Sequence, residues 1–195
     1  MKQIYIAALA FLTLTGASFA AATETAANPK VVITTSAGQI EIELDAEKAP
    51  ATVKNFLEYV DAGAYNGTIF HRVIGGFMIQ GGGYQPGMME KPTRAPINNE
   101  ADNGLKNLAG TIAMARTADP HSASAQFFIN TVDNAHLDHR DKSTEGWGYA
   151  VFGKVTKGMD TVREIEASPI RNDGEHEGVP VTDIVITRVE RVKEK

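Results

Sequence analysis

Residues 70–83 read FHRVIGGFMIQGGG, which is two short apolar runs separated by a pair of glycines. Two such runs around a glycine turn are typical of neighbouring β-strands. Side chains alternate along a strand, so the first run would place Phe70, Arg72 and Ile74 on one face. Arg72 would then point the same way as two large apolar residues, and an arginine there needs a partner or a functional role. A solvated edge position is the alternative interpretation.

In the second run, alternation would place Met78 and Gln80 on one face, and Phe77 and Ile79 on the other. The glycines at 81–83 could suggest a phosphate-binding loop. No Gly-Lys-Ser or Gly-Lys-Thr follows them and no helix start is apparent, so we reject this interpretation.

Similar runs rich in Val, Ile, Phe and Thr occur along the whole chain. They predict eight strands, at 31–35, 39–44, 68–74, 77–80, 111–115, 126–131, 150–155 and 184–192. The first two flank Ser36-Ala37-Gly38 and are predicted to form a hairpin. The long segment 81–110 has little periodicity and several Gly and Pro, which predicts an ordered surface loop.

Two segments have helical periodicity. One begins at Pro50, carries an apolar stripe at 53, 56, 57 and 60, and is predicted to close near Gly63. The other spans Met159–Glu166 and ends before Ser168-Pro169. Many strands with only two helices favour a mainly β fold, a closed or nearly closed barrel, over a βαβ sheet.

Composition excludes several classes of protein. The chain has 195 residues, 43% hydrophobic and 22% charged, which suits one globular domain. It has no cysteine, which excludes a disulfide framework, a thiolate zinc site and a cysteine nucleophile. A net charge of −5 argues against nucleic acid as a partner.

The first twenty residues have the pattern of a secretory signal. Lys2 supplies the positive start, the run 4–14 is apolar apart from Thr13, and small residues at Ser18 and Ala20 suit cleavage after Ala20. An uncleaved membrane anchor is the alternative. We therefore expect a signal peptide at 1–20, a flexible lead-in at 21–29 and one domain at 30–195, exported and with no stable membrane association.

The sequence lacks the residue patterns that metal binding, a nucleophilic serine or a catalytic carboxylate pair would need. His136 and His139 flank Asp138 and could imitate a metal site, but no third ligand is marked, so we expect no metal and no cofactor. Ser122 and Ser124 lack the turn that activates a nucleophilic serine. No carboxylate pair lies within an apolar stretch that would separate their pKa values for acid–base hydrolysis.

Several separated blocks of the sequence, in the same order, resemble the cyclophilins, which are peptidyl-prolyl cis–trans isomerases. With the signal-like start and the Met-Ala-Arg-Thr block at 114–117, the chain is most similar to the periplasmic branch of Gram-negative bacteria. The blocks are FHRVI (70–74), FMIQGG (77–82), NE (99–100), NGL (103–105), GTIAMA (110–115), SAQFFI (124–129) and VFGKV (151–155).

The resemblance implies a closed eight-stranded antiparallel barrel with a helix over each end and an outer groove that holds an X–Pro dipeptide. It implies that Arg72 is the catalytic arginine and that Gln80 supports it. It places the remaining substrate contacts on Phe77, Met78, Ala115, Gln126, Phe128, His136, Leu137 and Tyr149.

The chain departs from the family pattern at four positions. Gly75 stands where relatives often have proline, and Arg116 and Tyr149 stand where many eukaryotic members have asparagine and histidine. His136 stands where those members have a tryptophan that the family pattern links to cyclosporin, so we expect weak binding of cyclosporin-like cyclic peptides.

The resemblance predicts isomerisation of X–Pro bonds in exported, folding polypeptides by a monomer. Two alternatives stay open at this point. A module could bind proline-containing segments without isomerising their X–Pro bonds. Alternatively, a general periplasmic holdase chaperone could shield unfolded chains. The holdase would need a large apolar surface or an added domain.

Overall fold

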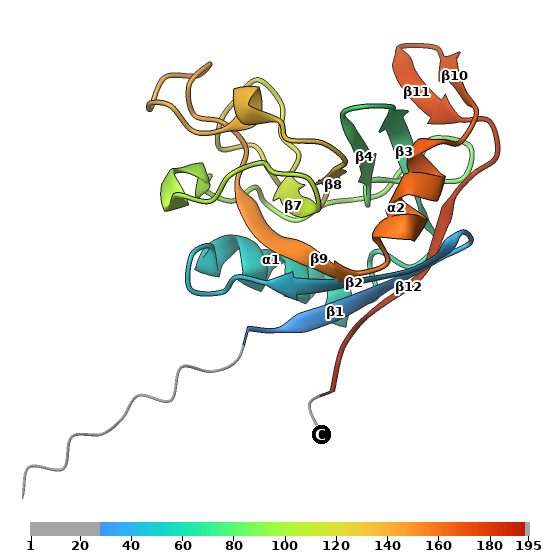
Figure 1. Ribbon diagram of the computed structural model, residues 1–195, viewed down its shortest axis with the longest axis horizontal. Helices are drawn as coiled ribbons and strands as arrows, with labels where there is room; N and C mark the ends of the chain where they lie inside the picture. The colour runs from blue at the N-terminus through green and yellow to red at the C-terminus, as the bar shows by residue number, and fades with distance from the viewer. Residues whose placement is uncertain (1–27, 194–195) are drawn as a thin grey trace, which may run out of the picture.

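The computed structural model describes residues 28–193, and they fold around a closed β-barrel (Figure 1). Eight antiparallel strands close it in the order β1-β12-β3-β4-β8-β7-β9-β2. Their bounds are β1 Lys30–Thr35, β2 Gly38–Leu44, β3 Thr68–Ile74, β4 Met78–Gly81, β7 Thr111–Met114, β8 Phe127–Asn130, β9 Val151–Lys157 and β12 Val185–Arg191. The predicted signal peptide at 1–20, and all of the predicted lead-in except residues 28 and 29, lie outside the described residues.

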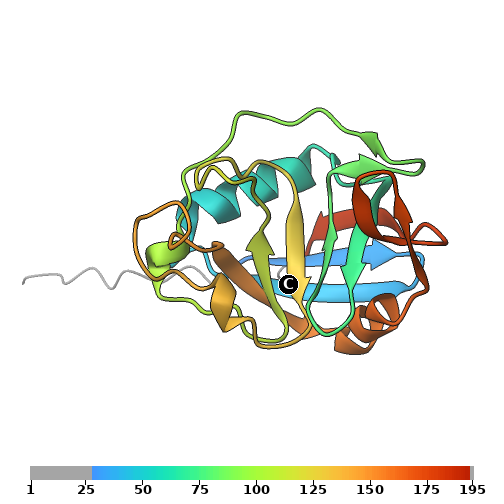
Figure 2. The ribbon, with the colours of Figure 1, turned by 90° about the horizontal axis from the view of Figure 1, so that it is seen from above.

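Two α-helices, α1 (Pro50–Asp61) and α2 (Met159–Glu166), lie on opposite sides of the barrel (Figure 2). Pro50 begins α1, where its missing N–H costs no hydrogen bond. Glu100 caps this end from a distant loop, because its carboxylate accepts the N–H groups of Ala51 and Thr52 at 3.1 and 2.8 Å. The apolar stripes of both helices pack into the same core as the inward side chains of the barrel.

The eight predicted strands correspond to the eight barrel strands, with bounds that differ by at most two residues. Strict alternation in β2 is confirmed, since Ile40, Ile42 and Leu44 are all fully buried inside the barrel. The β1–β2 hairpin is confirmed too, because Thr35 pairs with Gly38 around a two-residue turn. Both helices are confirmed.

The sequence prediction missed two small sheets outside the barrel. One pairs β5 (Tyr84–Gln85) with β6 (Met89–Glu90), inside the segment predicted to be loop, which also holds the 3-10 helix η1 (Ala101–Asn103). The other pairs β10 (Ile170–Asp173) with β11 (His176–Pro180). Every residue of β10 is exposed, so no buried face left an apolar alternation in its sequence. A second 3-10 helix, η2 (Ala135–Leu137), follows β8.

The prediction that Phe70 and Arg72 share a face is wrong. Phe70 pairs with Gly81 and Arg72 pairs with Gln80, so His71 is an extra residue in β3, a β-bulge. The bulge reverses the alternation at this point. Phe70 packs inside the barrel with Val73, whereas Arg72 faces outward.

The prediction that Phe77 lies on the same face as Ile79 is also wrong. Ile79 is in the barrel core, but Phe77 precedes β4, in the turn after β3, where strand alternation does not apply. Phe77 instead packs against a second apolar cluster on the outer surface of the barrel. That cluster consists of Met78, Ala113, Phe128, Leu137 and Val151.

Within residues 28–193, neither helix has the length and apolar character needed to cross a bilayer.

Candidate active site

The outer apolar cluster forms the floor of a hollow of about 270 Å³, which we call the main hollow. Cross-strand pairing brings its parts together, because Arg72 of β3 lies opposite Gln80 of β4, and Gln80 lies opposite Phe128 of β8. Residues directly opposite each other in neighbouring strands point to the same side of the sheet. The lining residues are Arg72, Phe77, Met78, Gln80, Ala115, Arg116, Phe128, Leu137 and Tyr149.

Arg72 is half-buried at the edge of the main hollow. Among residues 28–193 its guanidinium makes no hydrogen bond to another side chain or to the backbone, and it forms no ion pair. A guanidinium has five fixed N–H donors and stays charged at any physiological pH. All of these donors therefore remain available to a bound molecule.

Gln80 and Gln126 form one unit beside Arg72. The amide of Gln80 donates a hydrogen bond of 2.9 Å to the Oε1 atom of Gln126. Gly83 leaves room for this arrangement, because a Cβ atom there would come within 2.6 Å of the Gln126 side-chain amide nitrogen. Gln126 and Gln80 also line an adjoining hollow of about 200 Å³ that extends past Ala115.

The opposite end of the main hollow is apolar. Met78, Phe128 and Leu137 are each less than a tenth exposed, and their packed surfaces form its floor. Tyr149 lies with its ring at 79° to the ring of Phe128 and 5.6 Å from it. Phe77 closes the side next to the turn after β3. An apolar ring of the size of proline fits such a surface better than a charged group does.

A buried asparagine holds the two walls of this apolar end together. Asn134 is 3% exposed, and its amide donates to the carbonyl of Phe77 at 2.9 Å and to Asn130 Oδ1 at 2.7 Å. The backbone N–H of Leu137 donates to the carbonyl of Asn134 at 2.9 Å. Phe77 and Leu137 are thus tied to one residue, Phe77 through the side chain of Asn134 and Leu137 through its backbone carbonyl. Asn134 was not among the predicted site residues, because an asparagine in a loop carries no chemical signature.

His136 is the one predicted contact residue that the structure places outside both hollows. It is exposed, and its ring stacks on the ring of Phe77 at 5.6 Å and 28°. It therefore lies at the rim of the main hollow, next to one of its walls.

Arg116 lines the main hollow although it was predicted only as a departure from the family pattern, with no role. Its Nε–H donates to the carbonyl of Gly148 at 3.0 Å, and its Cζ atom lies 4.6 Å from the centre of the Tyr149 ring. These contacts hold the guanidinium over the ring of Tyr149. The sequence signal was present, since a charged residue lies two positions after the end of the buried β7 strand.

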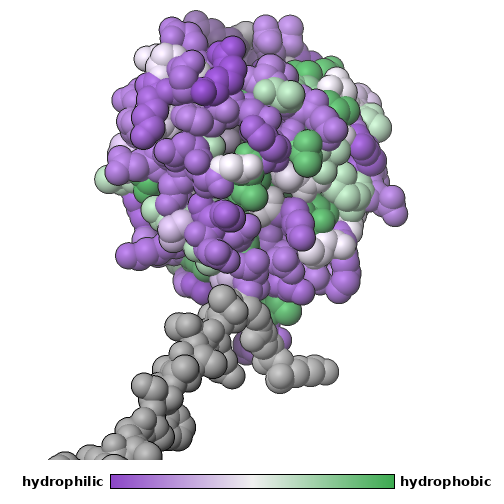
Figure 3. Space-filling view, turned by 60° about the vertical axis from the view of Figure 1, so that its left-hand side comes forward, coloured by the Kyte–Doolittle hydropathy of each residue, from purple (hydrophilic) through white to green (hydrophobic). Residues whose placement is uncertain are grey.

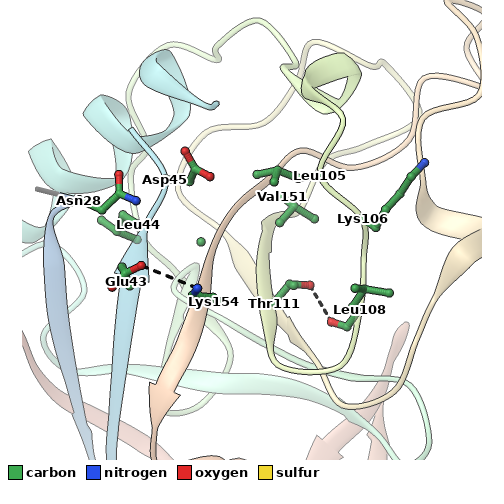
Figure 4. Close-up of a pocket in the computed structure, with 11 residues that line it drawn as sticks. Asn28, Glu43, Leu44, Asp45, Leu105, Lys106, Leu108, Thr111, Val151 and Lys154 are labelled. Carbon is green, nitrogen blue, oxygen red and sulfur yellow. Dashed lines mark hydrogen bonds and ion pairs between the residues drawn. The ribbon is translucent and has the colours of Figure 1, made fainter. Parts of the chain in front are cut away.

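A further apolar hollow, of about 240 Å³, lies between β2, β9 and the loop at 105–108, and none of the predicted site residues lines it (Figure 4). Its charged side chains are engaged with neighbours. Lys154 pairs with Glu43 at 3.8 Å, and Asp45 accepts the backbone N–H of Lys48 at 2.9 Å. This hollow therefore offers no free reactive group. Residues 28–193 also contain no cluster of three or more His, Asp or Glu side chains arranged to hold a metal ion.

The face of the molecule shown in Figure 3 carries apolar side chains in patches separated by hydrophilic ones. A protein that shields unfolded chains by hydrophobic contact would present a larger continuous patch.

The chain is similar to known proteins over almost its whole described length. Residues 30–191 match the family model described as cyclophilin type peptidyl-prolyl cis-trans isomerase/CLD. The chain is 53% identical over 194 residues to peptidyl-prolyl cis-trans isomerase A of Dickeya dadantii, covering 98% of each chain. It is 56% identical over 159 residues to peptidyl-prolyl cis-trans isomerase B of Escherichia coli, covering 82% of this chain and 97% of the relative.

A solved structure gives the same result for the fold. The crystal structure of a cyclophilin-type peptidyl-prolyl cis-trans isomerase of Cryptosporidium parvum, determined in the presence of the dipeptide Ala-Pro, is 30% identical in sequence. It superposes with a TM-score of 0.71 and covers 85% of this chain and 99% of the other. The chain belongs to the cyclophilin-type peptidyl-prolyl cis-trans isomerases, enzymes that interconvert the cis and trans forms of the peptide bond before proline.

Proposed function

We propose that the main hollow is the active site, that its apolar end holds the proline ring of an X–Pro segment, and that Arg72 is the catalytic residue. The observation that carries this proposal is the unpaired guanidinium of Arg72 beside an apolar floor. A half-buried charge without an ion-pair partner gives up part of its hydration and gains no contact within the fold, which suits a group that contacts a ligand. The Ala-Pro dipeptide named for the Cryptosporidium parvum relative supports an X–Pro ligand.

The chemistry needs no nucleophile or cofactor. Rotation about a peptide bond costs about 18–20 kcal/mol, because the twisted state loses the conjugation between nitrogen and carbonyl. Before proline, the two planar forms are close in energy but interconvert in tens to hundreds of seconds. A catalyst therefore only has to bind the twisted state more tightly than either planar form.

Arg72 suits this task by its position and its donors. In the twisted state the prolyl nitrogen becomes pyramidal and regains a lone pair, and a guanidinium N–H can donate a hydrogen bond to it. The contact exists only in the twisted state, so it lowers the barrier without tightening ground-state binding. A barrier lowered by about 7 kcal/mol gives roughly a 10⁵-fold acceleration.

The other predicted residues hold the substrate while it twists. Phe77, Met78, Phe128 and Leu137 would grip the proline ring, so that the carbonyl side of the bond turns. Ala115 and Gln126 would line the path of the residue before proline. Gln80, hydrogen-bonded to Gln126 and opposite Arg72 in the ladder, would support the arginine. Tyr149 would pack against the far side of the ring through its contact with Phe128.

The direct test is cis–trans exchange of an Ala-Ala-Pro-Ala peptide followed by NMR line shapes, with wild type and Arg72→Ala side by side. Wild type should accelerate exchange, and Arg72→Ala should lose most of the acceleration while peptide binding persists. A wild-type protein that binds the peptide without accelerating exchange would be a binding module, and the proposal would fail.

We further propose that the chain works on exported polypeptides as a monomer in the periplasm. The signal-like pattern at 1–20 supports export, and relatives from Gram-negative bacteria fit the periplasm as the destination. Expression of the full chain in a Gram-negative host, followed by cell fractionation and N-terminal sequencing, tests the proposal. Release with the periplasmic fraction and a mature start at Ala21 are expected, and retention in the membrane with Met1 intact would contradict it.

The role of a general chaperone has its own test. If the protein shielded unfolded chains independently of catalysis, Arg72→Ala would suppress aggregation of a proline-free client as strongly as wild type. We expect neither protein to do so, because the apolar groups of the main hollow form a small concave site and not an extended surface.

A further inference from the structure

Arg72 and Gln80 also line a second hollow on their other side, of about 340 Å³, which we call the polar hollow. It lies between β3, β5 and the β10–β11 hairpin, which stands beside β3 (Figure 1). The lining residues are His71, Arg72, Gln80, Tyr84, Gln126, Glu175, His176 and Glu177. No residue of the apolar cluster is among them.

Two carboxylates lie on the hairpin side of the polar hollow. Glu175 lies in the β10–β11 turn and Glu177 lies two residues further, in β11, and both are exposed. Within residues 28–193 neither forms an ion pair. Their charge is therefore not neutralised by a neighbouring lysine or arginine.

The inner wall of the polar hollow holds a polar group without a partner. His71, the bulge residue of β3, is only 4% exposed, and no described residue hydrogen-bonds to its Nδ1 atom. Burial lowers the pKa of His71 to about 4, so the ring is uncharged at neutral pH. A buried, neutral imidazole nitrogen without a partner is costly to leave unpaired. In the tautomer protonated at Nε2, Nδ1 is an acceptor, and a donor from a ligand satisfies it.

Tyr84 supplies an aromatic surface beside these groups. Its ring lies 4.6 Å from the ring of His71 and 5.4 Å from that of His176. Aromatic faces attract cations, as carboxylates do. Apart from Arg72, the groups that line this hollow therefore favour a positively charged ligand.

We infer that the polar hollow is an extension of the substrate groove that accepts a lysine or arginine side chain of the client, close to the proline in sequence. The inference rests on the proposed function of the main hollow. Since Arg72 and Gln80 line both the main and the polar hollow, the two adjoin, and a side chain a few residues from a proline on Phe128 can reach the polar hollow. One residue of extended chain spans about 3.3 Å. Glu175 and Glu177 are then specificity-determining residues.

The test compares three peptides with the same Ala-Ala-Pro-Ala core, flanked on both sides by lysine, by glutamate or by alanine. Exchange is followed by NMR, which needs no coupling protease. The sequence preference of such a protease therefore cannot alter the measured rates. At low salt, wild type should show a kcat/KM for the lysine peptide roughly fivefold above that for the glutamate peptide, because two exposed charges act together. High salt should reduce this ratio.

The double variant Glu175→Gln/Glu177→Gln should bring the ratio close to one. The control, Glu47→Gln/Glu190→Gln, removes the same charge from exposed positions that do not line the polar hollow and should keep the wild-type ratio. A wild-type ratio near or below one would overturn the inference, as would an equal fall in both double variants. Turnover of the alanine peptide by wild type tests the isomerase function separately.

Discussion

Arg72 and Gln80 lie directly opposite each other across the β3–β4 ladder, immediately after the bulge at His71. Without the bulge, Arg72 would share a face with Phe70, whose ring is fully buried in the barrel core. One extra residue in β3 therefore turns the arginine to the outer surface while its neighbours continue to fill the barrel. Bulges of this kind often re-aim a side chain at a functional site.

Both Arg72→Lys and Arg72→Ala should keep the fold and lose about 100-fold or more in kcat/KM, a loss of about 2.7 kcal/mol in transition-state binding. Lysine keeps the charge but not the fork of fixed donors. Because Arg72 has no partner among the described residues, thermal unfolding should change little. The measurements are NMR exchange of a proline peptide and a thermal melt of each variant.

A rate within a few fold of wild type for either variant would remove Arg72 from the catalytic role. A large fall in melting temperature would instead show that Arg72 supports the structure. Arg116→Ala is the matched control, because it removes another guanidinium from the same hollow, one that is already engaged with Gly148 and Tyr149. Its loss should be smaller than that of Arg72→Ala.

Asn134→Ala should weaken the apolar end of the main hollow. The substitution leaves the Oδ1 atom of Asn130 without its donor and removes one of the two donors to the carbonyl of Phe77, which also accepts the N–H of Thr131. The free energy of unfolding should therefore fall by about 1–3 kcal/mol. Phe77 would be held by one hydrogen bond fewer, so KM should rise more than kcat falls. Steady-state kinetics and urea unfolding measure the two effects.

The control for Asn134→Ala is Glu100→Ala, which removes the cap of α1. It destabilises the protein at a position that lines neither the main hollow nor the polar hollow. Its KM should match that of wild type. If both variants raise KM equally, general loosening explains the effect and Asn134 has no specific positioning role.

The barrel was predictable because its strands bury one face. Runs such as 39–44 alternate strictly, and the inward residues of β2 are those that alternation marked. The β10–β11 hairpin left no such pattern, because its first strand is wholly exposed. The sequence therefore predicted the parts of the fold that fill the core and missed a part that borders the site.

The site was only partly predictable. Period-two alternation put Met78 and Gln80 together correctly, but it failed at Phe70 and Arg72, since a bulge cannot be read from alternation in one strand alone. The roles of Arg72 and the contact residues came from resemblance to a family. The engagement of Arg116 and the positions of Asn134 and Glu175 depend on loop geometry, which short-range patterns do not encode.

Acid should destabilise the protein through His71. Burial, with Arg72 and His176 nearby, lowers its pKa from 6.5 to about 4, so the unfolded chain binds the proton more tightly than the folded one. The stabilising contribution is then complete above pH 6.5 and is lost as the pH falls toward 4. The loss amounts to about 3 kcal/mol. Urea unfolding of wild type and His71→Gln across this range measures it.

The difference between the two proteins isolates His71, because they share every other titrating group. Curves of unfolding free energy against pH that run parallel would contradict the buried, neutral histidine. NMR titration of the His71 ring in wild type gives a second, independent readout. A titration midpoint near the ordinary histidine pKa would also show that the ring is not shielded from protonation by burial.

His136→Trp should strengthen binding of cyclosporin. His136 is exposed and stacks on Phe77 at the rim of the main hollow, so an indole there would extend the apolar wall beyond Phe77. The larger ring buries more apolar surface against a bulky cyclic peptide, which should tighten Kd by about tenfold or more. Isothermal titration calorimetry measures the Kd.

Leu108→Trp is the control, because it adds an indole at an exposed position lining the hollow of Figure 4 and should leave Kd unchanged. Equal affinity in wild type and His136→Trp would show that residue 136 does not contact the cyclic peptide.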